Sequence, residues 1–324
     1  MESNRPIGGF YELEIPKKKG TYHSKALALT NGRACLSLIL DIEKPTKVYI
    51  PFYTCFALYE PLIKKNIEVA FYAVDENLEP KKLPVLKDDE LFVYINYFGI
   101  KDRCCAGLIE IFNDKLVIDD THQFFNKGYK ANYSFTSARK YFGVPDGAYL
   151  YLKNESENDY NFPRPEHISL DHNVGRLEEN YSSAYESYLL AEGNFGSEVL
   201  KISKISEKIL ETINYQFVKS RRTQNFMFLH DKFKYINQFE LDDVSVATPF
   251  CYPLVLNKII DKRLFHESNI FIPTLWPDIS SRSNLEFDFE NGFANRLLPL
   301  PIDHRYNESD MKRLTYITER IINE

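Results

Sequence analysis

Three short segments in the first half of the chain carry side chains that could take part in chemistry. Residues 30–34, with the sequence TNGRA, precede a run of helix formers. Asp119 and Asp120 end an apolar run and are followed closely by His122. Lys140 lies in a stretch that is rich in aromatic residues and glycine. Each segment has an ordinary structural explanation and a chemical one.

The first segment is typical of a helix start. Asn31 or Gly32 can cap the helix, which leaves backbone N–H groups and the positive end of the helix dipole facing outward. Helix N-termini bind phosphate in this way. An ordinary cap is the more common meaning of such a pattern, so this segment alone does not identify an anion site.

The acidic pair comes at the end of a predicted buried strand. Ligands bind outside the carboxyl ends of the strands in open α/β sheets, so Asp119 and Asp120 stand where a ligand would be met. The pair could ligate magnesium, pair with a buried cation or cap the next helix. The spacing does not decide among these roles.

The lysine segment allows a covalent role. Burial lowers the pKa of a lysine ammonium, and the free amine can then form a Schiff base. Lys140 follows a predicted strand and precedes Gly143 and Gly147, which suits such a position. A solvated surface lysine is the more common case.

Taken together, the three segments indicate one cofactor. A helix end for a phosphate, a strand-end aspartate for a pyridine nitrogen and a lysine for an aldehyde are the parts that hold pyridoxal 5'-phosphate (PLP). The aspartate would keep the pyridine nitrogen protonated, so that the ring withdraws electrons. No other common cofactor accounts for all three segments.

The elements that must position these residues follow an α/β pattern. Near-continuous apolar runs that alternate with helical stretches predict a mainly parallel sheet with helices on both faces. The predicted strands are 48–50, 69–72, 91–95, 116–118 and 148–151.

The second half of the chain has a different pattern. Residues 177–236 contain no proline and predict two or three helices. Strands are predicted at 249–256 and 270–272, and helices at 259–266 and 308–322. We therefore expect a large PLP-binding domain with bridging helices over residues 1–220 and a smaller α+β domain over residues 221–324.

The composition excludes several classes of protein. The chain has 324 residues, of which 44% are hydrophobic and 27% charged, and this composition is typical of a folded globular protein. A net charge of -6 offers no footprint for nucleic-acid binding. The five cysteines include no CxxC pair, so we expect neither a metal site nor a disulfide framework. No apolar run has membrane-spanning length and no signal peptide is visible, which predicts a cytoplasmic protein without a membrane partner.

Several segments resemble the DegT family of PLP-dependent sugar aminotransferases. Residues 30–36 resemble the serine-glycine-threonine-alanine turn of the family, and residues 50–75 its next strand-helix-strand unit. Further similar segments are the family's H-x-x-G segment (96–99), its I-E-D strand (117–123), its lysine loop (134–147) and the approach to its last helix (298–301). The similarity spans nearly the whole chain and implies the fold type I PLP-transferase architecture.

The resemblance implies how the cofactor phosphate would be bound. Gly32 and Arg33 would give backbone N–H groups to it. Ser137 stands three residues before Lys140, a common spacing for a phosphate-binding serine in this fold type. Ser134, at the family's phenylalanine-serine-phenylalanine position, is the alternative.

The resemblance also implies the role of the lysine. Counted without gaps the family lysine falls on Arg139, but arginine cannot form an imine, so we assign the role to Lys140. Lys140 would form the internal aldimine and then move a proton between Cα and C4' as a general base. The position that stacks an aromatic ring on the cofactor holds Cys55, and Tyr53 or Phe56 could supply the ring instead.

Two assignments of the acid are open. Asp119 with His122, or Asp120 with Gln123, would each give an acid for the pyridine nitrogen and a hydrogen-bonding partner for the cofactor's 3'-oxygen. We favour Asp119 with His122, because the DDTH sequence also resembles a strand of related PLP acyltransferases.

The function that the resemblance implies is amino transfer from an amino acid such as glutamate to a keto sugar carried by a nucleotide. It also implies a homodimer with the active site at the subunit interface. One alternative is a PLP-dependent sugar dehydratase or another elimination enzyme, although that branch of the family replaces the catalytic lysine with histidine and no histidine lies near Lys140. A second alternative is a protein that kept the scaffold and lost productive turnover.

Overall fold

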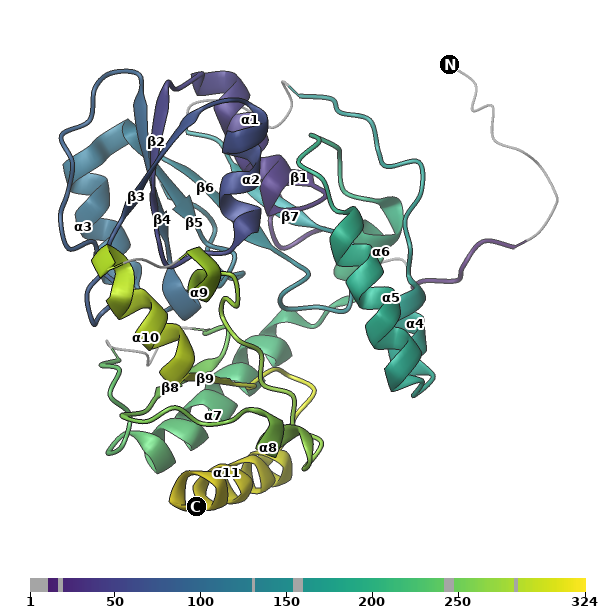
Figure 1. Cartoon of the computed structure of the whole chain (residues 1–324). Coiled ribbons are helices and arrows are strands. Elements are labelled where there is room, and N and C mark those ends of the chain that lie inside the picture. Colours follow the sequence, from purple (N-terminus) through teal and green to yellow (C-terminus); the bar gives the residue numbers. More distant parts are fainter. Residues whose placement is uncertain (1–10, 17–19, 130–131, 154–159, 242–247, 283–284) are drawn as a thin grey trace.

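A seven-stranded sheet forms the centre of the first half of the chain (Figure 1). The computed structural model describes residues 11–16, 20–129, 132–153, 160–241, 248–282 and 285–324. The strands of this sheet are β1 (Leu27–Leu29), β2 (Lys47–Pro51), β3 (Glu68–Tyr72), β4 (Glu90–Ile95), β5 (Leu116–Asp119), β6 (Tyr133–Ser137) and β7 (Ala148–Tyr151). Their order is β1-β7-β6-β5-β4-β2-β3, and only the pairs that involve β7 are antiparallel. The expected α/β class and mainly parallel sheet are confirmed.

Helices cover both faces of the sheet. They are α1 (Gly32–Glu43), α2 (Phe56–Lys64) and α3 (Asp102–Phe112), with the short 3-10 turns η1 (Tyr97–Gly99) and η2 (Asn113–Lys115). The ring of Phe135 in β6 lies next to Gly32 of α1. Phe92 in β4 stacks on Phe112 of α3 with ring centroids 4.5 Å apart. Phe92 is paired with Leu116 of β5 and Phe135 with Asp119 of β5. Side chains alternate along a strand, so Phe92 and Phe135 point to opposite faces of the sheet, and α3 and α1 therefore lie on opposite faces.

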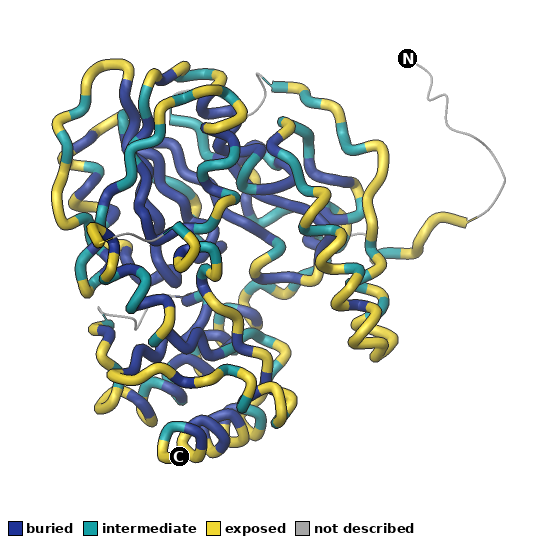
Figure 2. Tube along the Cα trace, viewed as in Figure 1, coloured by how far each residue is buried: buried dark blue, intermediate teal, exposed yellow. Residues whose placement is uncertain are grey.

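The second half of the chain adds helices and a two-stranded antiparallel sheet (Figure 1). The helices are α4 (Asp171–Leu177), α5 (Tyr181–Asn194), α6 (Lys204–Thr212), α7 (Tyr215–Phe233), α8 (Arg263–His266), α9 (Ile279–Arg282), α10 (Asp288–Arg296) and α11 (Glu308–Asn323), with η4 (Leu285–Phe287). The strands are β8 (Tyr252–Val255) and β9 (Leu297–Leu300). The expected domain boundary at residue 220 falls inside α7. Buried residues of both sheets belong to one continuous hydrophobic cluster (Figure 2).

One predicted strand is wrong. Residues 270–272 form no strand in the structure. Their alternation is real, since Ile270 and Ile272 are buried and Phe271 is exposed. A strand also needs a neighbour to complete its backbone hydrogen bonds, and none is paired with this segment in the described part of the chain.

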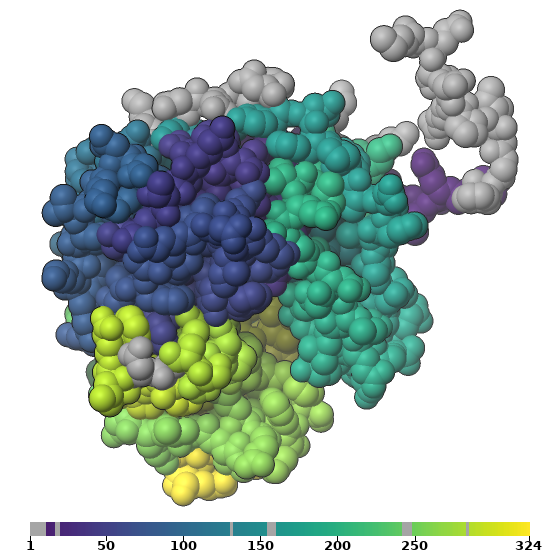
Figure 3. All heavy atoms as spheres, turned by 45° about the horizontal axis from the view of Figure 1, so that its top comes forward, coloured from purple at the N-terminus to yellow at the C-terminus, as the bar shows by residue number. Residues whose placement is uncertain are grey.

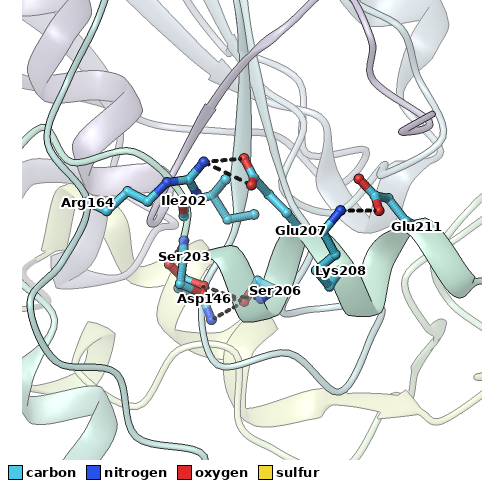
Figure 4. Close-up of polar contacts among 8 residues, drawn as sticks. All are labelled: Asp146, Arg164, Ile202, Ser203, Ser206, Glu207, Lys208 and Glu211. Carbon is cyan, nitrogen blue, oxygen red and sulfur yellow. Dashed lines mark hydrogen bonds and ion pairs between the residues drawn. The ribbon is translucent and has the colours of Figure 1, made fainter. Parts of the chain in front are cut away.

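The loop that follows Lys140 is fastened to the start of α6 (Figure 4). Asp146 accepts hydrogen bonds from the backbone N–H of Ser203 (2.8 Å), from the Ser203 hydroxyl (2.6 Å) and from the Ser206 hydroxyl. Ser203 is also the N-cap of α6. A second link joins Arg164 to Glu207 at 2.9 Å. The end of the loop, at Asp146, and the segment beyond β7, at Arg164, are therefore both joined to α6.

None of the helices in the described ranges is long and apolar enough to cross a membrane.

Replacing Asp146 with alanine should lower the free energy of unfolding by about 1–3 kcal/mol, because it leaves a buried N–H and two buried hydroxyls without their acceptor. Thermal unfolding of the purified protein measures this. Asp88, which is fully exposed, is the matched position, and Asp88→Ala should unfold close to the wild-type temperature. Equal melting temperatures for the two variants would contradict the anchoring role.

Candidate active site

Lys140 lies beside the end of β5. Its Nζ donates a hydrogen bond to the hydroxyl of Thr121 at 2.9 Å. The side chain is reached by solvent, yet protein atoms surround it closely. Desolvation lowers the pKa of the Lys140 ammonium below its ordinary value, and the nearby Asp119 carboxylate opposes this change. The amine is therefore easier to deprotonate than that of a surface lysine.

Arg139 is held in a different place. Its guanidinium pairs with Glu192 near the end of α5 and lies over the ring of Phe195, 4.2 Å from the centroid. Of the two neighbouring cations, it is Lys140 that reaches the ends of the central strands. This arrangement supports the choice of Lys140 over Arg139 as the lysine of the site.

The start of α1 offers two backbone donors. Asn31 caps the helix by accepting a hydrogen bond from the N–H of Ala34 at 2.9 Å, as one of the predicted caps. The N–H groups of Gly32 and Arg33 have no acceptor in the described part of the chain. The guanidinium of Arg33 pairs with Glu60 at 2.8 Å, so Arg33 offers only its backbone. These two donors and the helix dipole suit an anion.

The start of α1 lies next to Thr121, the residue that contacts Lys140. A Cβ atom built on Gly32 would be 3.5 Å from Cγ2 of Thr121. Thr121 in turn accepts the hydrogen bond from Lys140. The first and third segments that the sequence singled out are therefore brought together through Thr121.

Asp119 faces the α1 side of the sheet. It is paired in register with Phe135, whose ring lies next to Gly32. Its Oδ1 accepts the N–H of Thr121 at 2.8 Å, and its Oδ2 has no hydrogen-bond partner among the residues that the structure describes. Desolvation raises the pKa of the Asp119 carboxyl, and Lys140 partly offsets this. Asp119 thus has one carboxylate oxygen free for a ligand.

Asp120 is engaged on the other side of the chain. Its carboxylate accepts hydrogen bonds from the side-chain amides of Asn96 (2.9 Å) and Asn126 (3.0 Å). Burial raises the pKa of the Asp120 carboxyl well above its ordinary value. Gln123, the residue paired with Asp120 in the second assignment, donates its amide to the carbonyl of Gly99 at 2.8 Å. These contacts favour the assignment to Asp119 with His122.

His122 is enclosed by aromatic rings. Its Nδ1 accepts the N–H of Phe98 at 3.2 Å. The imidazole stacks on Phe250 with centroids 4.6 Å apart and on Trp276 with centroids 5.9 Å apart. Burial lowers the pKa of His122 well below its ordinary value, so the ring is neutral. A side chain at Gly99 (φ +73°) would collide with the carbonyl of His122, so glycine is required there.

The two serine candidates lie on opposite faces of β6. Strand side chains alternate, so Ser137 shares the face of Phe135, next to α1, and Ser134 points to the other face. Ser134 is 1% exposed, and its hydroxyl has no hydrogen-bond partner in the described ranges. The structure therefore brings Ser137 to the end of the strand and does not bring Ser134 to the site.

The rings proposed to replace the stacking residue lie elsewhere. Tyr53 is buried, and its hydroxyl donates to the carbonyl of Leu275 at 2.5 Å. Phe56 is half-exposed at the start of α2. The aromatic side chain that faces Lys140 is Phe250, whose ring centroid is 5.9 Å from Nζ.

Sequence reasoning missed two residues of this site, Thr121 and Phe250. Thr121 stands inside the DDTH segment but has no chemical signature of its own. Phe250 is more than 100 residues away from Lys140, and no local pattern announces such a contact. Only the folded chain shows that these residues meet.

A cavity of about 470 Å³ lies next to the start of α1. Its walls include the cap Asn31, Pro145 from the loop after Lys140, and Ala191, Asn194 and Phe195 at the end of α5. Lys140 itself is not part of its lining. No group of three or more His, Cys, Asp or Glu side chains in the described part of the chain is arranged to hold a metal ion.

The fold matches that of sugar aminotransferases of known structure. CalS13 from Micromonospora echinospora is 14% identical, with a TM-score of 0.61 over 92% of this chain and 88% of that one. A DegT DnrJ EryC1 StrS aminotransferase from Brucella abortus is 15% identical, with a TM-score of 0.58 over 92% and 86%. Spr1654 from Streptococcus pneumoniae, described as a sugar aminotransferase and solved in a PLP form, is 12% identical, with a TM-score of 0.61 over 93% and 89%.

At these identities the likeness establishes the fold. The expectation of a sugar-aminotransferase fold, with a DegT-type protein among its neighbours, is confirmed. No family model matches the sequence, and no curated protein matches it.

Replacing Asp120 with alanine should destabilise the protein by about 1–3 kcal/mol, because the amide of the buried Asn96 and that of the partly buried Asn126 each lose an acceptor. Asp119→Ala should have a smaller effect, since only one N–H depends on it. Chemical denaturation of both variants measures the difference. A larger loss of stability for Asp119→Ala than for Asp120→Ala would contradict the assignment of Asp120 as the structural acid and Asp119 as the acid that faces the ligand.

Proposed function

We propose that this chain is a PLP-dependent aminotransferase that moves an amino group from an amino acid such as glutamate to a keto sugar carried by a nucleotide. The observation that carries the proposal is the position of Lys140, whose amine touches Thr121 close to both Asp119 and the start of α1. When bound, pyridoxal 5'-phosphate supplies an aldehyde and a ring that withdraws electrons.

The start of α1 would bind the phosphate. Gly32 and Arg33 contribute the two N–H groups that lack an acceptor within the described residues. Ser137, at the end of β6 and on the α1 side, adds a hydroxyl. Two backbone donors, a hydroxyl and the helix dipole would together bind the phosphate and offset part of its charge.

Asp119 and His122 would orient the ring. The free Oδ2 of Asp119 is suited to a protonated pyridine nitrogen, and that positive charge would offset the desolvation of the carboxylate. His122 is neutral and fixed by the stacked rings, so it can offer a hydrogen bond to the 3'-oxygen.

Lys140 would have two roles. Its lowered pKa makes the free amine available to bind the cofactor aldehyde covalently. With the cofactor and an amino donor bound, the same amine would serve as the base for the proton on the donor's Cα. The hydroxyl of Thr121 would keep the Nζ atom in position for both roles by accepting its hydrogen bond.

The sugar acceptor and the homodimer are part of the same proposal. The acceptor is supported by the structural neighbours, which are described as sugar aminotransferases. The alternative of a PLP-dependent sugar dehydratase gains no support from the site, because His122 is buried and neutral and the side chain that reaches the strand ends is a lysine.

Lys140→Ala should abolish the visible absorption band of the lysine-bound cofactor, because Lys140 is the amine that contacts Thr121 among the described residues. Arg139→Gln is the matched control and should keep the band, since Arg139 contacts Glu192 and Phe195 instead. Absorption spectra of the two purified variants with PLP show whether each of them keeps the band. A band that survives Lys140→Ala would refute the assignment of the lysine.

Addition of glutamate to the wild-type holoprotein tests the reaction itself. The band should be replaced by that of the aminated cofactor. An unchanged spectrum would instead favour the reading in which the scaffold has lost turnover.

A further inference from the structure

Arg222 of α7 is a buried cation that the proposed mechanism does not use. It is 1% exposed, yet it forms no ion pair with an acid in the described part of the chain. Asp303, a carboxylate whose charge acts on it, pairs with Arg305 instead at 2.7 Å. Burying a guanidinium without an acidic partner costs free energy, so core stability does not explain why an arginine stands here.

The Arg222 guanidinium binds two successive backbone carbonyls. Its Nε donates a hydrogen bond to the carbonyl of Pro249 at 3.2 Å, and its Nη2 donates to the carbonyl of Phe250 at 2.7 Å. The backbone N–H of Phe250 donates to the carbonyl of Phe98 at 2.8 Å. Both backbone polar groups of Phe250 are therefore engaged, and the rigid fork of the arginine fixes the direction of its carbonyl.

The ring of Phe250 lies flat on His122. The two ring planes differ by 6°, and their centroids are 4.6 Å apart. Phe98 joins the same arrangement, because its own N–H donates to Nδ1 of His122 at 3.2 Å. Phe98 has a φ of +56°, which is uncommon for an aromatic residue. The backbone of one residue thus contacts both rings of the stack, through its carbonyl and its N–H.

This arrangement joins the two halves of the chain. Phe98 and His122 belong to the first half, whereas Arg222 and Phe250 belong to the second. In Figure 3 the yellow-green atoms of the second half pack directly against the blue atoms of the first. The ring of Tyr141 lies under the guanidinium, 4.3 Å from the centroid, and holds the fork in one plane.

We propose that Arg222 is a positioning residue, which fixes the ring of Phe250 and through it the plane of the His122 imidazole. The inference rests on the proposed function, in which His122 offers a hydrogen bond to the 3'-oxygen of the cofactor. Because Nδ1 accepts the N–H of Phe98, the neutral imidazole carries its proton on Nε2. Nε2 has no hydrogen-bond partner among the described residues, so a fixed ring keeps a free donor in one direction.

Trp276 reports on His122 in the full-length protein without cofactor. It is the single tryptophan of the chain, and its ring is stacked with that of His122 at a centroid distance of 5.9 Å. A protonated imidazole quenches the fluorescence of a neighbouring tryptophan. Burial holds the pKa of His122 well below its ordinary value, and the charge of Lys140 lowers it further. The emission of the wild-type apoprotein should therefore stay constant from about pH 8 to about pH 6.

Arg222→Met keeps an apolar side chain of similar length and removes both donors. The ring of Phe250 can then tilt and admit water, so the pKa of His122 should rise toward its ordinary value by about one pH unit or more. The midpoint of Trp276 quenching should move to higher pH by the same amount. Phe250→Leu should give the same shift. Adding Arg222→Met to Phe250→Leu should move the midpoint no further, because Arg222 acts through Phe250.

Arg221→Met is the matched control, since Arg221 lies over the ring of Phe217 on the same helix instead. It should titrate as the wild type does. In the presence of PLP, Arg222→Met should raise the dissociation constant of the cofactor by at least about 10-fold, the effect of losing one hydrogen bond to a charged group. Arg221→Met should leave this constant unchanged.

A folded Arg222→Met protein that titrates as the wild type does, or a double variant in which the two shifts add, would overturn the inference. Circular dichroism of each variant checks the fold. If Arg222→Met does not fold, Arg222→Lys gives the same comparison, because one ammonium cannot replace the planar fork and should also move the midpoint upward. The fluorescence titration needs no cofactor, so a wild-type protein that shows no visible band with PLP would refute the proposed function and leave this result to be read by itself.

Discussion

The carboxyl edge of the parallel sheet is the constraint on which the site depends. β5 and β6 are neighbours that run in the same direction, so Asp119 and Ser137 end at the same edge. α1 covers the face to which these side chains point, and its free N–H groups begin beside Thr121. Lys140 enters the same space because the chain turns directly after β6. A parallel pair and one helix thus bring together groups that are about 110 residues apart.

Desolvation by the surrounding protein atoms gives these groups their chemistry, although Asp119, Asp120 and His122 are buried and Lys140 is exposed. Removing water lowers the pKa of Lys140 and raises that of Asp119, and the two charges partly compensate each other. Asp120 is desolvated in the same way but is surrounded by amide donors, which leaves it a structural role. The two adjacent aspartates therefore have different roles because their hydrogen-bond partners differ. His122 shows the same effect, because its aromatic enclosure keeps it neutral.

Much of the fold could be predicted from the sequence, because buried parallel strands read as apolar runs and TNGRA reads as a helix start. The segment at 270–272 alternates in the same way as a strand but lacks a pairing partner, which no local pattern shows. The choice between Ser134 and Ser137 depends on which side chains of β6 face α1, and only the packing of the strand against that helix decides this. Phe250 and its contact with His122 come from the far half of the chain, so only tertiary structure reveals them.

The most direct measurement of the central claim is the site of covalent attachment. The holoprotein is reduced with borohydride, which makes the bond between the lysine and the cofactor permanent, and is then digested and analysed by mass spectrometry. The account predicts one modified peptide, with the pyridoxyl mass on Lys140. A pyridoxyl group on another lysine, or none on any peptide of a protein that shows the visible band, would contradict it.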